Sequence, residues 1–75
     1  MIYTEEELLE AKGQIESTLH KLEETVRTLE AKGEARRYKS QITLAKRRIQ
    51  AFRIALSLVD RELAAGPAEK FSESY

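Results

Sequence analysis

His20 is the only histidine among the 75 residues, and Glu16 and Glu24 lie about one helical turn to either side of it. Imidazole and carboxylate groups at this spacing could ligate a metal or exchange protons. A di-iron site in a helical bundle needs a Glu-x-x-His pattern and further histidines, and the sequence has neither. It also has no cysteine, which excludes thiolate sites and disulfides. We therefore expect His20 to be a surface residue, with no metal and no other cofactor.

Four carboxylates near the N-terminus could act as a general acid and base; they are Glu5, Glu6, Glu7 and Glu10. Thr4 and Glu7, however, have the spacing of a capping box, in which each side chain accepts a backbone N–H of the other residue. An acidic first turn also suits the positive end of a helix dipole. We therefore interpret this cluster as the start of a helix. Because the sequence also lacks a glycine-rich phosphate loop, we expect no enzymatic activity.

Basic residues concentrate in one stretch, although the 13 basic and 13 acidic residues of the whole chain balance. Residues 35–53 contain seven basic residues and no acidic one. Four of these have no evident charged partner and could bind phosphate groups: Arg36, Arg37, Arg47 and Arg48. A membrane-surface helix is a further interpretation, but an acidic partner helix disfavours it. We expect a solvated surface here and keep nucleic-acid binding as the alternative function.

Two amphipathic helices must position these residues. In the second half of the chain, apolar residues alternate at steps of three and four: Ile42, Ala45, Ile49, Phe52, Leu56, Val59 and Leu63. In the first half, a similar row comprises Leu8, Ile15, Leu19, Leu22, Val26 and Leu29. A mean repeat of 3.5 residues is the heptad pattern of helices that pack together. Lys12 also falls in the first row, where its stem can extend to water.

Glycine and proline mark the ends of these helices. Gly33 can end the first helix and Gly66-Pro67 the second, because glycine accepts a left-handed conformation after the last turn. The second helix begins between Ala35 and Ser40, and Ser40 is an alternative cap. One uninterrupted helix paired with another chain is the competing interpretation. The expected organisation is a domain over residues 1–67, with a helix over about 4–32, a turn over about 33–37 and a helix over about 36–65, and a flexible tail over 68–75.

The two apolar rows predict an antiparallel, coiled-coil-like hairpin, an all-α fold. The numbers of four facing pairs each add to 71: Leu29 with Ile42, Leu22 with Ile49, Ile15 with Leu56, and Leu8 with Leu63. On one flank, three pairs of opposite charges have numbers that add to 69, so each pair lies at nearly one height in the same fold-back. The predicted ion pairs are Glu30 with Lys39, Glu23 with Lys46, and Glu16 with Arg53. Such pairs select a register more than they add stability.

The second helix carries a further apolar surface on the other flank. We call it the apolar stripe; it consists of Leu44, Ala51, Ala55 and Leu58. The facing flank of the first helix is small and uncharged, and it cannot cover the stripe. Exposed apolar surface on a small protein usually marks a partner site. We therefore predict a homodimer or higher even oligomer, in which two hairpins form a four-helix bundle through the apolar stripe. Docking of another protein on the stripe is the alternative.

Three segments carry a resemblance to a known family. They are Tyr-Thr-Glu-Glu-Glu-Leu at 3–8, then Ile15 with Ser17-Thr18-Leu19 and Lys21, and Ser40-Gln41-x-Thr43-Leu44-x-Lys46-x-Arg48-Ile49-x-Ala51-x-x-Ile54-Ala55. The chain resembles small helical-hairpin proteins of Gram-positive bacteria, often encoded among mobile-element genes and without known activity. The resemblance implies a hairpin and a bacterial cytoplasm, and it brings no functional residues.

The function that we expect is therefore that of a small structural or adaptor protein that associates with itself and possesses no catalytic site. No apolar run reaches the length of a membrane span, and the N-terminus lacks the basic and then apolar pattern of a signal peptide. These two observations predict a cytoplasmic protein without a membrane partner.

Overall fold

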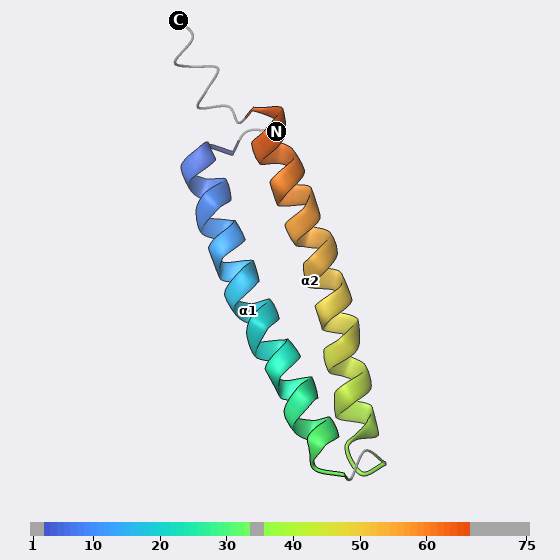
Figure 1. The fold of residues 1–75 in the computed structure, drawn as a ribbon. Coiled ribbons are helices and arrows are strands. Elements are labelled where there is room, and N and C mark those ends of the chain that lie inside the picture. Colours follow the sequence, from blue (N-terminus) through green and yellow to red (C-terminus); the bar gives the residue numbers. More distant parts are fainter. Residues whose placement is uncertain (1–2, 34–35, 67–75) are drawn as a thin grey trace, which may run out of the picture.

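A computed structural model describes residues 3–33 and 36–66 of the chain. It consists of two helices of equal length that pack against each other as a hairpin (Figure 1). Helix α1 spans Glu5–Ala31 and helix α2 spans Lys39–Ala65, with 27 residues in each. At 1.5 Å per residue, each helix is about 40 Å long. The start of α1 and the end of α2 lie at the same end of the hairpin, which we call the open end, and the turn lies at the other.

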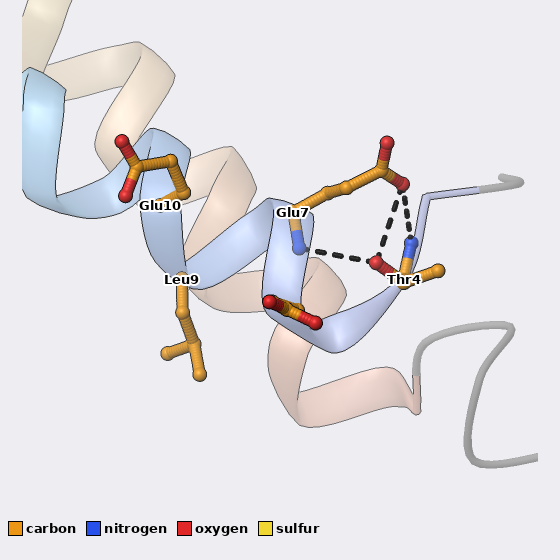
Figure 2. A pocket seen from close by; sticks show the side chains of 5 residues that line it. Thr4, Glu7, Leu9 and Glu10 are labelled. Carbon is orange, nitrogen blue, oxygen red and sulfur yellow. Dashed lines mark hydrogen bonds between the residues drawn. The ribbon is translucent and has the colours of Figure 1, made fainter.

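The predicted capping box begins α1. The Glu7 N–H donates to Thr4 Oγ1 over 3.1 Å, and the Thr4 N–H donates to the Glu7 carboxylate over 3.0 Å (Figure 2). Thr4 itself has an extended backbone, as an N-cap residue should. The capping box therefore satisfies two backbone N–H groups at this helix terminus, and this prediction is confirmed.

The turn follows the predicted glycine but leads into α2 differently. Gly33 has a φ of +72°, the left-handed conformation expected after a helix end. Helix α2 then begins at Lys39, with Tyr38 as its N-cap residue and no capping hydrogen bond from a side chain. Ser40 lies inside the first turn of α2, so it is not the cap. The Lys32 ammonium and the Arg37 guanidinium lie 5.4 and 5.6 Å from the centre of the Tyr38 ring.

Tyr38 thus takes the place of a polar cap. Its ring packs against the buried core and carries a cation on its surface, while its carbonyl accepts the Ile42 N–H over 2.9 Å. Packing rather than cap chemistry sets the first residue of α2. At the other end, α2 stops before Gly66, whose φ is +97°. Pro67 and the predicted tail over 68–75 lie outside the described residues.

The core lies in the half of the hairpin nearer the turn. Its buried members are Val26, Ile42, Ala45 and Ile49, and Leu19, Leu22, Leu29 and Tyr38 pack against them. Two of the predicted facing pairs belong to this cluster: Leu29 with Ile42, and Leu22 with Ile49. Toward the open end, Leu8 is buried, while Phe52, Leu56, Val59 and Leu63 are only half-buried.

A single interface between two helices therefore leaves much of the apolar surface of both rows exposed to solvent. Ile49 and Phe52 are neighbours in the predicted apolar row of the second helix, but only Ile49 is buried and Phe52 is half-buried. Neither described helix is long and apolar enough to cross a membrane.

Candidate self-association surface

The apolar stripe is accessible to solvent. Leu44 and Leu58 expose 47% and 55% of their surface, Ala51 is exposed, and Ala55 is half-buried. The stripe lies on α2 away from the core residues, so α1 leaves most of it uncovered. Leu44, Ala51 and Leu58 are thus exposed on the flank where their helical spacing put them, whereas Ala55 is partly covered.

Ile54 extends the stripe and was missed as a member of it. It is 52% exposed and lies one turn before Leu58 and three residues after Ala51. The signal that could have identified it is this spacing, which puts the three side chains on one face. Isoleucine at such an exposure is costly in water, because its branched side chain presents apolar surface that a partner could bury.

An apolar hollow continues the stripe onto α1 at the open end. Side chains from both helices line it: Tyr3, Glu7, Leu8, Ala11, Leu58, Val59 and Glu62. Its volume is about 340 Å³, and its two carboxylates stand among five less polar neighbours. The hollow joins the exposed Tyr3, at 51%, to the exposed Leu58. Sequence periodicity could not have found it, because Tyr3 precedes the first helix and meets α2 only in three dimensions.

The α1 flank beside the stripe has few free polar groups. The Thr25 hydroxyl donates to the Lys21 carbonyl one turn earlier, over 2.9 Å. A hydroxyl satisfied within its own helix needs no water or partner hydrogen bond. Ala11 and Thr18 complete this flank, so a neighbouring helix would meet small side chains and no charge.

The opposite flank carries three ion pairs between the helices, but not with the predicted partners. Lys46 Nζ lies 3.2 Å from Glu30 Oε2, and Arg53 Nη2 lies 2.7 Å from Glu23 Oε2. Lys46 was expected to pair with Glu23 and Arg53 with Glu16, and each of these glutamates lies seven residues before the observed partner. Among the described residues, Lys39 and Glu16 are in no ion pair within 4.0 Å. The predicted pairing was therefore wrong by one heptad.

The direction of side chains in a helix explains this shift. Every Cα–Cβ bond leans toward the N-terminus of its own helix. Lys46 on α2 thus leans toward the turn, whereas Glu30 on α1 leans away from it, and their charged groups converge. Lys39 starts nearer the turn and leans further in that direction, so it recedes from Glu30. The sequence prediction compared Cα heights and ignored this lean.

The third pair joins Lys12 to Asp60 near the open end. Lys12 Nζ and Asp60 Oδ1 are 2.9 Å apart. The hydrogen bond to Asp60, together with the charge of that carboxylate, raises the pKa of Lys12 above its usual 10.5. Lys12 therefore does not simply extend into water from the seam, as predicted, but links the two helices. The signal was present in the sequence, since Asp60 continues the seven-residue spacing of Lys39, Lys46 and Arg53 with the opposite charge.

The candidate phosphate-binding arginines are divided between two places. Arg36 and Arg37 lie in the turn, and the latter contacts the Tyr38 ring. Arg47 and Arg48 are exposed on α2, about two turns beyond its start. Along the axis, roughly 12 Å separates these arginines from Lys39. The structure thus does not gather the four side chains at a single point.

The polar groups considered for chemistry do not form a cluster of metal ligands in the part of the chain that is described. His20 is exposed, and the Glu24 carboxylate accepts hydrogen bonds from Arg27 over 2.8 and 3.0 Å. Residues 3–33 and 36–66 contain no group of three or more potential ligands arranged for a metal ion.

A wide hollow beside the first turn of α1 is lined by Thr4, Glu6, Glu7, Leu9 and Glu10 (Figure 2). Two of its polar side chains, Thr4 and Glu7, already bind each other in the capping box.

Comparisons with known proteins find nothing similar: no family model, no curated protein and no solved structure matches the chain. The resemblance to Gram-positive hairpin proteins stays a prediction.

Proposed function

We propose that the chain is an antiparallel helical hairpin that acts as a structural or adaptor module, and that it does so by associating with itself into a four-helix bundle. The contact surface is the apolar stripe, extended by Ile54. The observation that carries the proposal is that Leu44, Ile54 and Leu58 are each about half-exposed on one side of α2. Two alanines between the leucines allow a second helix to approach closely.

The energetics favour association of modest strength. Full burial of a leucine is worth ~1.5–3 kcal/mol, so covering the exposed half of Leu44 or Leu58 is worth roughly 1 kcal/mol. Association costs at least ~4 kcal/mol in lost freedom, so the stripe, Ile54 and the hollow must all contribute. A micromolar Kd corresponds to about 8 kcal/mol, so it requires that the stripe, Ile54 and the hollow of both copies be buried together. Stability should then rise with protein concentration.

Sedimentation velocity from about 1 to 100 µM tests this proposal. The wild type should shift from hairpin monomer toward dimer or tetramer across this range. Leu58→Glu and Ala51→Glu should remove the shift, because a charge in the interface would lose its water. Ser57→Glu is the matched control: it adds the same charge at an exposed position beside Leu58 but outside the stripe. A wild type that stays a folded monomer at tens of micromolar would contradict the proposal.

The alternative, nucleic-acid binding through Arg36, Arg37, Arg47 and Arg48, is tested by anisotropy titration with duplex and single-stranded DNA at low salt. Phosphate contacts are strongest under those conditions. Self-association without any DNA binding at low salt supports the module. DNA binding that is lost in Arg47→Ala with Arg48→Ala would favour the alternative.

A further inference from the structure

The two ends of the hairpin carry opposite charge. At the open end, described residues 3–13 and 58–66 contain six acidic and two basic residues, a net charge of −4. At the turn end, described residues 24–33 and 36–48 contain two acidic and eight basic residues, a net charge of +6. Two hairpins side by side would therefore attract when they run in opposite directions and repel when they run in the same direction.

The apolar hollow shows the same asymmetry on a local scale. Glu7 and Glu62 stand at an otherwise apolar depression. Leu44, at the far end of the stripe, is the exposed leucine that is followed one turn later by Arg47 and Arg48. The hollow therefore suits an apolar side chain that has basic neighbours. Leu44 of a second copy of the chain is such a side chain.

We infer that two hairpins pack with their α2 helices antiparallel, and that Leu44 of each copy occupies the hollow of the other. This inference rests on the proposed self-association. On α2 the hollow is formed by Leu58, Val59 and Glu62, which centre near position 60. A two-fold axis that sets position 44 opposite this centre passes near Phe52, between Ala51 and Ala55. With this single two-fold axis, Leu44 of each copy fills the hollow of the other, and the alanines lie where the two α2 helices approach most closely.

The same arrangement brings Arg48 to Glu62 of the second copy. In the hairpin, Glu30 with Lys46 and Glu23 with Arg53 each add to 76, five more than the 71 of the facing core residues, whereas Lys12 with Asp60 adds to 72. The excess reflects the lean of side chains toward each N-terminus. Across the proposed axis, facing positions add to about 104 and Arg48 with Glu62 adds to 110, a similar excess. Within the described residues, neither side chain is in an ion pair within 4.0 Å.

Charge exchange tests the ion pair. Arg48→Glu and Glu62→Arg should each weaken dimerisation roughly tenfold, because a dimer contains the contact twice. The double exchange should restore the Kd to within about threefold of the wild type. Arg47→Glu tests the specificity of the contact: it makes the same change at the other basic neighbour of Leu44, and Glu62→Arg should not rescue it. A double exchange that remains as weak as its parents would overturn the contact.

Spin labels test the direction of packing, since the chain has no cysteine of its own. A label at Thr43→Cys lies nine residues from the proposed axis, so the two copies should be at least ~27 Å apart. A label at Gln50→Cys, close to the axis, should give a much shorter distance. Short distances at both positions would mean parallel packing and would overturn the inference, while the dimer itself would remain. A monomeric wild type in sedimentation would instead defeat the proposed function.

Discussion

Reversing two charges on the ion-pair flank should measure how the helices are aligned. The change is Lys46→Glu with Arg53→Glu, which puts like charges beside Glu30 and Glu23. Each side chain in these pairs is between 37% and 58% exposed, so water screens the interaction and each pair is worth only ~0.3–0.5 kcal/mol. Repulsion costs about as much as attraction contributes. The double variant should therefore lose roughly 1–2 kcal/mol of unfolding free energy.

The assay is thermal unfolding followed by circular dichroism at one fixed protein concentration, since association would shift the midpoint. For a chain of this size, 1 kcal/mol corresponds to about 4–8 °C in Tm. A parallel urea titration would give the same free energy from its midpoint and slope.

Two rescue variants then distinguish the observed register from the one expected from sequence. Adding Glu23→Lys with Glu30→Lys restores opposite charges in the observed register and should recover most of the lost Tm. Adding Glu16→Lys with Glu23→Lys restores both pairs of the register predicted from Cα heights but only one of the two observed pairs, Glu23 with Arg53, so it should recover less. If the second set rescues as well as the first, our reasoning about side-chain lean is refuted.

Three further substitutions probe the core and the helix backbone. Ile49→Ala should lower the unfolding free energy by ~2–5 kcal/mol, because Ile49 is buried, and chemical denaturation will show whether the variant still unfolds cooperatively. Gly13→Ala should stabilise by roughly 1 kcal/mol, since an added Cβ there meets nothing within 4 Å and alanine favours the helix. Gly33→Ala should destabilise by about 1 kcal/mol or more, because its φ of +72° strains an alanine; an increase in Tm would contradict this.

The features predicted well from sequence are those that depend on neighbours along the chain. Thr4 and Glu7 are three residues apart, so their capping box follows from local spacing alone. The facing apolar rows were also identifiable, because a 3.5-residue repeat fixes which side of each helix turns inward. Leu44 and Leu58 could be assigned to an exposed flank for the same reason.

The features that were missed depend on distances between helices. Glu30 pairs with Lys46 rather than Lys39 because side chains lean along the axis, which spacing does not record. The start of α2 depends on Tyr38 packing against the core, and no polar cap signals it. The hollow is lined by Tyr3 and Val59, which lie near opposite ends of the sequence, so it could be identified only in the folded chain.

The concentration of buried side chains near the turn also has a kinetic consequence. The first contacts to form, such as those of Val26 with Ala45, close a short loop and lose little chain entropy. Folding of an isolated hairpin with such local contacts is expected within microseconds to milliseconds. The same gradient makes separation of the helices begin at the opposite extremity, where Lys12 and Asp60 hold them together. Amide protons in the first turns of α1 should therefore exchange with solvent well before those around Val26.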